Sequence, residues 1–111
     1  MLVSLGKDQL LNLIAGKNTT ILSTLRLGTS STAADASQSA LGAQVLSAIP
    51  EITLDITNHL LTIRASFQSD GSTYREVGIF AGSVMISRSV ISATTFTAGV
   101  LFYVQVSLTI S

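Results

Sequence analysis

The sequence predicts a mainly β protein, an antiparallel β-sandwich of six to seven strands with one short N-terminal helix. Apolar and polar residues alternate with a period of two over most of the chain after residue 43, which is typical of strands with one buried face. Gly, Asp and Asn residues separate the alternating segments and supply turn chemistry. No segment of crossover-helix length separates the later strands, so neighbouring strands are expected to run antiparallel.

The length of 111 residues is enough for one domain. We expect an N-terminal arm with the short helix over residues 1–19 and the β-sandwich domain over residues 20–111. A helix is predicted over residues 7–15, with Gly16 placed to end it. Its apolar residues at helical spacing are Leu10, Leu11, Leu13 and Ile14.

The first strand is predicted over residues 19–27. Residues 29–39 are small and polar, so they are expected to form an exposed loop, or a single helical turn near residues 35–41. A hairpin is predicted over residues 51–67 with its turn at Asn58-His59. One face of that hairpin should be buried, namely the face that carries Ile52, Leu54 and Ile56 on one strand and Leu61, Ile63, Ala65 and Phe67 on the other.

A second hairpin is predicted from residues 74–80 and 84–91, joined by Ala81-Gly82-Ser83. The last strand covers residues 100–110 and alternates most regularly. Its apolar face carries Val100, Phe102, Val104, Val106, Leu108 and Ile110. Such a long edge normally carries Lys, Glu or Pro in a monomer, and this chain has almost none beyond residue 88, so pairing with another subunit or a scaffold is expected.

The content of charged residues is low. Charged residues make up 11% of the chain, against roughly 25% in an average soluble protein. Six basic residues balance six acidic ones, so no cationic field exists to follow a phosphate backbone, and nucleic acid is not an expected partner. The 16 Ser and 13 Thr make the surface weakly repulsive, which is typical of an assembly component.

Candidate catalytic and metal-binding residues are few. His59 is the only histidine and lies in a predicted turn, and the chain has no cysteine. Glu51 and Asp55 share one strand face, but four residues separate their backbones by about 13 Å, beyond the carboxyl spacing of glycosidases. Residues 70–72 are too poor in acids for a calcium loop. We therefore predict no catalytic, cofactor or metal site, and no enzyme.

Arg75 and Glu76 are an adjacent charged pair in an otherwise apolar strand. Neighbouring residues of a strand point to opposite faces, so both cannot be solvated if one face is covered. One of them should meet an opposite charge across a strand or across a subunit boundary. Gly78, in the interior of the same strand, is expected to mark a bulge or a close backbone approach.

Several segments together resemble a module of tailed-bacteriophage virion proteins, found in tail-fibre, collar and head-decoration proteins. The central segment, Arg75-Glu76-Val77-Gly78-Ile79-Phe80, resembles the module's Arg-Glu-Ile-Gly-Leu-Phe motif. The other matching segments, spread over residues 20–110, are Leu27-Gly28-Thr29-Ser30, Ser39-Ala40-Leu41-Gly42, Met85-Ile86-Ser87-Arg88-Ser89-Val90, Thr97-Ala98-Gly99 and the alternating end from Val104 to Ile110. Departures from the pattern are Ser30 for a glycine, Ala81 for an aspartate, and the lack of a tryptophan in the last strand.

The resemblance implies a structural protein located in a virion. We expect a capsid decoration (cement) protein that stabilises the shell as a homotrimer, with phage capsid or tail proteins as partners. Neither a signal peptide nor a membrane segment is predicted, because no apolar run approaches about 18 residues. The residues expected to make the interactions are Leu2, Leu5, Leu10 and Leu13 in the N-terminal arm, Arg75 and Glu76, and Phe102.

Two alternatives stay open at this point. The chain could be a tail-fibre, collar or baseplate component, which differs from a cement protein in copy number. It could also be a carbohydrate- or receptor-binding module. A glycan site needs exposed aromatic rings for stacking, and the chain has no Trp and only Tyr74 and Tyr103, both within predicted strands.

Overall fold

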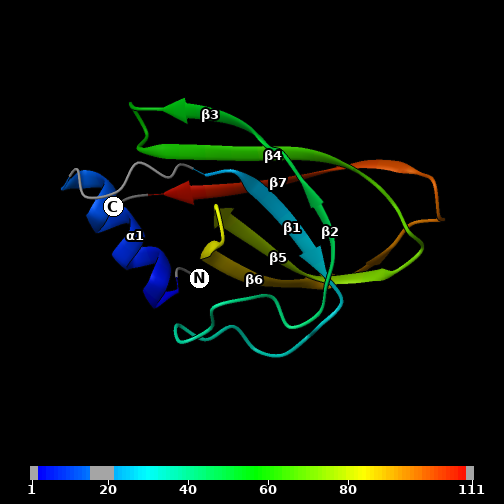
Figure 1. The fold of residues 1–111 in the computed structure, drawn as a ribbon. Coiled ribbons are helices and arrows are strands. Elements are labelled where there is room, and N and C mark those ends of the chain that lie inside the picture. The colour runs from blue at the N-terminus through cyan, green and yellow to red at the C-terminus, as the bar shows by residue number, and fades with distance from the viewer. Residues whose placement is uncertain (1–2, 16–21, 110–111) are drawn as a thin grey trace.

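The computed structural model describes residues 3–15 and 22–109, and it confirms the predicted fold class (Figure 1). Seven strands form two antiparallel sheets, preceded by one short helix in the described part of the chain. In chain order the elements are α1 (Ser4–Ile14), β1 (Thr24–Gly28), β2 (Gln44–Ala48), β3 (Glu51–Asp55), β4 (Leu60–Gln68), β5 (Thr73–Ala81), β6 (Val84–Thr95) and β7 (Leu101–Thr109).

The two sheets have the strand orders β2-β1-β5-β6 and β3-β4-β7. The chain passes from the four-stranded to the three-stranded sheet at Ile49-Pro50, between β2 and β3. The β3–β4 hairpin turns at residues 56–59, and His59 adopts a positive φ of 53° there. The β5–β6 hairpin turns at Gly82-Ser83, where Gly82 has a φ of 61°.

The main core lies between the two sheets and includes four aromatic rings. Phe102 of β7 stacks on Phe67 at 5.7 Å and on Phe96 at 4.5 Å between ring centroids, and its ring lies 5.3 Å from that of Tyr74. Inward residues of both sheets complete this core: Leu25, Leu27, Ile63, Ala65, Val77 and Ile79. The alternation predicted for the last strand is confirmed from Leu101 onward, because Phe102 is buried and Val104 and Val106 are half-buried, whereas Leu101 and Tyr103 are exposed. Val100 precedes the strand and is 42% exposed, so its predicted inward position is wrong, and Ile110 lies outside the described residues.

The four-stranded sheet is covered on its other face as well. The pairing of β5 with β6 shifts register between Tyr74 and Glu76, so Tyr74 and Val77 both face the main core while Glu76 points to the opposite side. On that side a second cluster forms from Val3, Leu41, Phe80 and Met85. The N-terminal segment and the loop over residues 29–43 supply this cover.

Several element boundaries differ from those predicted. The helix begins at Ser4 rather than at residue 7, and Gly16 lies outside the described residues. The first strand begins at Thr24 rather than at residue 19. Residues 29–43 form a loop with a turn at residues 36–37 and no helical turn. Strand β2 is an additional element that the sequence did not predict separately, and its half-buried Leu46 and Ala48 pack against the main core.

The predicted burial of the β3 face is wrong. Ile52, Leu54 and Ile56 are 42%, 65% and 73% exposed. They pair correctly with β4, with Ile52 opposite Ile63 and Leu54 opposite Leu61. The face stays uncovered because β3 is the outer strand of its sheet and extends beyond the four-stranded sheet (Figure 1).

Candidate functional site

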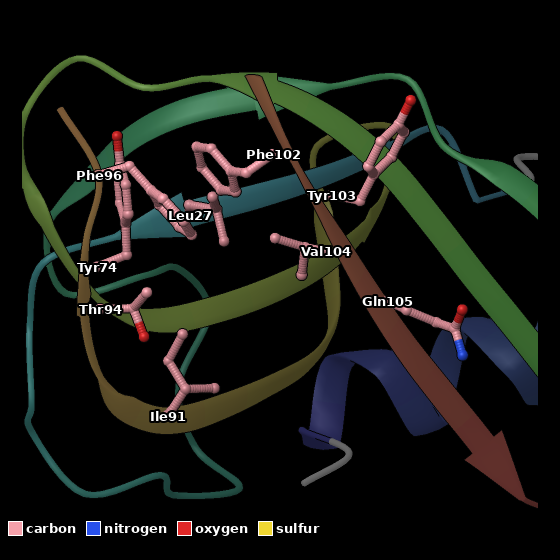
Figure 2. A pocket seen from close by; sticks show the side chains of 9 residues that line it. All are labelled: Leu27, Tyr74, Ile91, Thr94, Phe96, Phe102, Tyr103, Val104 and Gln105. Carbon is pink, nitrogen blue, oxygen red and sulfur yellow. The ribbon is translucent and has the colours of Figure 1, made fainter. Parts of the chain in front are cut away.

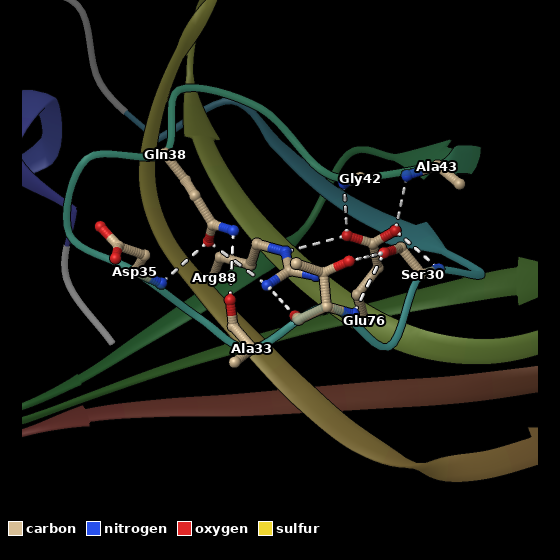
Figure 3. A network of polar contacts seen from close by, with 9 residues as sticks. Ser30, Ala33, Asp35, Gln38, Gly42, Ala43, Glu76 and Arg88 are labelled. Carbon is tan, nitrogen blue, oxygen red and sulfur yellow. Dashed lines mark hydrogen bonds and ion pairs between the residues drawn. The ribbon is translucent and has the colours of Figure 1, made fainter.

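A buried ion pair joins β5 to β6 on the outer face of the four-stranded sheet (Figure 3). Arg88 Nε donates to Glu76 Oε1 at 2.9 Å, and both side chains are fully buried. Arg88 lies opposite Gly78 in the strand register, so the pair is diagonal across neighbouring strands. The expectation that one of Arg75 and Glu76 meets an opposite charge is therefore confirmed for Glu76, across a strand of the same chain.

Three backbone amides complete the environment of the Glu76 carboxylate. The Gly42 amide donates to Oε1 at 2.7 Å, and the amides of Ala43 and Ser30 donate to Oε2 at 2.8 and 3.0 Å. Burial raises the pKa of Glu76, but the hydrogen bonds from Ala43, Gly42, Arg88 and Ser30 outweigh burial, so the pKa lies below its ordinary value. The buried side chain is thus held as a carboxylate.

Arg88 contacts the other half of the same loop. Its Nη1 donates to the Thr32 carbonyl at 2.8 Å and to Gln38 Oε1 at 3.3 Å. The same Gln38 oxygen accepts the Asp35 amide at 3.0 Å, and Gln38 Nε2 donates to the Ala33 carbonyl at 3.3 Å. One buried ion pair therefore fixes the loop from Ser30 to Ala43, which is otherwise small, polar and poor in core residues.

Glycines allow the loop to approach β5 closely. A Cβ on Gly28 would overlap the Glu76 carboxylate and the Ala43 carbonyl. A Cβ on Gly78 would lie 2.7 Å from Leu41 Cδ2, so Leu41 packs directly on the bare backbone of β5. The close approach expected at Gly78 is confirmed, and the approaching group is the Leu41 side chain.

Both charged groups of the Glu76–Arg88 pair are closed off from solvent, and their contacts join β5, β6 and the loop. Elsewhere, Glu51 and His59 lie on the exposed β3–β4 hairpin, and Asp55 accepts hydrogen bonds from Asn58 in its turn. Within residues 3–15 and 22–109, no group of three or more His, Asp or Glu side chains is placed to hold a metal ion.

The predicted interaction residues of the N-terminal segment differ in how far they are exposed to solvent. Leu5 is 46% exposed and Leu10 is half-buried, Leu13 lies in α1, and Leu2 is outside the described residues. The face of α1 that packs on β6 carries Gly6 and Gln9, and the preceding Val3 donates its amide to the Ile86 carbonyl at 3.0 Å. The segment is therefore packed on the sandwich, with Val3 in the second cluster.

The other predicted interaction residues lie inside the molecule or at its margin. Glu76 and Phe102 are buried in this chain, in the ion pair and in the aromatic core respectively. Arg75 is half-buried, and its Nη1 donates to the Thr29 carbonyl at 3.4 Å. Glu76 and Phe102 therefore stabilise the fold of this chain itself.

Two apolar surfaces are open to solvent instead. The first, the β3 face, consists of Ile52, Leu54 and Ile56. The second is a lateral opening of the sandwich between β6 and β7, with a volume of about 270 Å³ (Figure 2). Its floor is buried and partly aromatic, and its lining residues are Leu27, Tyr74, Ile91, Thr94, Phe96, Phe102, Tyr103, Val104 and Gln105.

The outer face of the three-stranded sheet has a different character. Tyr103 is 66% exposed, and the Arg64 guanidinium lies 4.3 Å from the centre of its ring. Together with Glu51 and Ser66 they line a shallow polar hollow. The exposure of Tyr103 agrees with the alternation predicted for the last strand, which places Tyr103 on the face opposite Phe102.

Comparisons with protein-family models, with curated proteins and with solved structures found no match to this chain. The described helix is too short and too polar to cross a membrane. The functional proposals below therefore depend on the contacts and exposed surfaces described above and on the motif resemblance.

Proposed function

We propose that this protein is a structural component of a tailed-phage virion, a capsid decoration protein that acts as a trimer. The observation that carries the proposal is the exposed β3 face. Ile52 and Leu54 in β3 and Ile56 just after it stand at alternate positions, which is the pattern of a buried strand face, yet the single chain leaves these residues open. A partner protein that covers this face would bury these three side chains.

The motif resemblance gives the class of partner. The segments that carry it contact one another: the segment of Glu76 binds those of Ser30, Gly42 and Arg88. Residues far apart in the chain thus cooperate in one arrangement, which supports treating the short motif matches as parts of a single structural module. On this basis a phage capsid protein is the proposed partner.

The mechanism is passive stabilisation. Ile52, Leu54 and Ile56 together expose nearly two full side-chain surfaces, and burying that area contributes about 3–5 kcal/mol before the costs of association. This free energy exists only when neighbouring capsid subunits are assembled, so it favours the closed shell. Each chain adds a small amount, and many copies on one shell add up.

The test uses purified virions of the phage that encodes the chain. We expect hundreds of copies per particle by densitometry, located on the head in a cryo-EM map. A Leu54→Ser/Ile56→Ser variant should keep its circular dichroism spectrum and lose incorporation, whereas Thr53→Ser, on the opposite face of β3, should be incorporated normally. Absence of the chain from virions, or normal incorporation of the double serine variant, would overturn the proposal.

A handful of copies located on the tail would instead support a tail-fibre, collar or baseplate role. The outer face of the three-stranded sheet favours a second candidate function, a carbohydrate-binding module, because Tyr103 presents an exposed ring beside the polar Arg64 and Glu51. Glycan-array binding by the wild type that is lost in Tyr103→Ala would support this function. Failure of the wild type to bind any glycan would exclude it.

A further inference from the structure

The two strands that border the lateral opening have free backbone edges. Among the described residues, β7 pairs with β4 on one side only, and β6 pairs with β5 on one side only. The Val3 amide covers the start of the free β6 edge through its bond to the Ile86 carbonyl. In the part of the chain that the structure describes, β6 beyond Arg88, over residues 89–95, and β7 therefore have no neighbouring strand on their outer side.

These two edges carry no charged residue or proline of the kind that usually protects edge strands, and β6 has an irregularity opposite Arg75, where its pairing with β5 shifts register between Val90 and Thr94. No charged side chain and no proline occurs after Arg88 in the sequence. The other two edge strands, β2 and β3, have only five residues each; Pro50 lies between them, and β3 carries Glu51 and Asp55. Long uncharged edges pair readily with a further strand, so β6 and β7 are the edges suited to pairing.

The opening itself suits protein side chains more than a small molecule. Its volume of about 270 Å³ lies below the ~300–1,000 Å³ of typical ligand sites. Ile91 and Thr94 on β6 face Val104 on β7 across the opening (Figure 2), and none of the lining residues is charged. The occupant must therefore be neutral and strand-shaped, with small or apolar inward side chains.

We propose that the occupant is a second copy of this chain, in which β6 of one copy pairs with β7 of the next. Each copy carries both uncharged edges, so this head-to-tail pairing covers β6 and β7 of every copy once the ring closes, whereas pairing of β7 with β7 alone would leave β6 exposed. The openings then face the centre of the ring and are covered there. The number of copies, three, rests on the proposed function; the pairing of edges does not.

The test places charges on exposed positions of both edges. One variant carries four lysines, at Ser92, Thr94, Gln105 and Ser107. The matched variant carries lysine at Ser92 and Thr94 but glutamate at Gln105 and Ser107. Facing edges of neighbouring copies repel in the first variant and attract in the second, over distances comparable to the Debye length of about 10 Å.

In analytical ultracentrifugation we expect the wild type and the lysine–glutamate variant to sediment as one closed oligomer, and the four-lysine variant to sediment as a monomer. A control has the same added charge away from both edges and should remain an oligomer: lysine at Asn12, Ser31, Ser39 and Thr57. Dissociation of both edge variants would indicate β7–β7 pairing and overturn the proposal. A monomeric wild type, or an oligomeric four-lysine variant, would also overturn it.

Hydrogen–deuterium exchange of the wild type tests the same pairing without substitutions. Peptides covering residues 88–95 and 101–109 should both become more protected as the protein concentration rises through the association range. Protection of neither segment, or of β7 alone, would refute the pairing. If the wild type forms these oligomers but is not incorporated into virions, the pairing of β6 with β7 stands and the proposed virion function is refuted.

Discussion

Replacement of Glu76 by glutamine is the most informative perturbation of the interior. Glu76→Gln keeps the shape of the side chain but removes its charge, leaving the fully buried Arg88 without an anion. It also places an NH₂ group among amide donors that need an acceptor, because three backbone amides and Arg88 all donate to the carboxylate. The substitution therefore creates an unpaired buried charge together with a donor–donor conflict.

The expected loss follows from these contacts. Breaking one partner of a buried ion pair costs about 3–5 kcal/mol. A domain of this size has a total stability of about 5–15 kcal/mol, so Glu76→Gln should remove about a fifth of it or more. Urea denaturation followed by far-UV circular dichroism measures the change in the free energy of unfolding. We expect the loop over residues 29–43 to become susceptible to proteolysis in the same variant, since Glu76 and Arg88 hold it.

Two variants make this prediction refutable. Glu51→Gln has the same chemistry on an exposed strand and should change the free energy of unfolding by less than about 0.5 kcal/mol. Glu76→Gln combined with Arg88→Met removes both charges, so it should be more stable than Glu76→Gln alone. This prediction is refuted if Glu76→Gln and Glu51→Gln lower the free energy of unfolding equally. It is also refuted if the double variant loses as much free energy of unfolding as Glu76→Gln and Arg88→Met lose separately when added together.

Three further outcomes are expected. The pKa of Glu76 in the folded chain lies below its ordinary value of 4.5, so on acidification the unfolded chain binds a proton at Glu76 before the folded chain does. The stability that the Glu76 carboxylate contributes is therefore complete above about pH 4.5 and is lost as the pH falls further. Urea titrations at several pH values should show this loss in the wild type and not in Glu76→Gln. Gly6→Ala places a methyl group against the Ile86 carbonyl and should cost about 1–3 kcal/mol in thermal unfolding. Tyr74→Phe removes the hydroxyl that bonds the Asp70 amide and carboxylate, and should cost about 1–3 kcal/mol in urea unfolding.

Controls for these outcomes come from neighbouring positions. Lys7→Ala, on the exposed side of α1, should leave thermal unfolding nearly unchanged. Alanine favours a helix more than glycine does, so a loss in Gly6→Ala reports the contact with Ile86, and no loss in this variant would refute that contact. Tyr103→Phe alters an exposed tyrosine and should be neutral for stability. Identical acid sensitivity of wild type and Glu76→Gln would refute the assignment of the acid transition to Glu76.

The hairpins were predictable because a period of two is local information. The pairs 51–67 and 74–91, and the inward face of β7, follow from alternation and turn residues alone. Alternation shows which residues share a face but not whether a second layer covers that face. The β3 face was misjudged for this reason, since its cover depends on the extent of the opposite sheet.

The interior site was predictable only in part. The adjacent charges Arg75 and Glu76 indicated that one of them meets an opposite charge, which is correct. The choice of Glu76 depends on the register shift in β5, which reverses the face of the strand, and no residue pattern marked that shift. The amide donors of Gly42 and Ala43 are backbone groups in a loop, so the sequence holds no side-chain signal for them.

The two apolar surfaces can act independently because they lie at opposite edges of one sheet. β3 and β7 flank β4 in the three-stranded sheet, so a partner on the β3 face does not approach the free edge of β7. Self-association through β6 and β7 therefore leaves Ile52, Leu54 and Ile56 open on every copy. A closed oligomer would present several β3 faces at fixed spacing. It would therefore bind a repeating surface, such as a capsid, more tightly than a single chain does. Serine substitutions in the β3 face should abolish attachment to the proposed capsid partner while the oligomer stays intact. Charges on β6 and β7 should weaken that attachment only because the separated chains bind with one β3 face each.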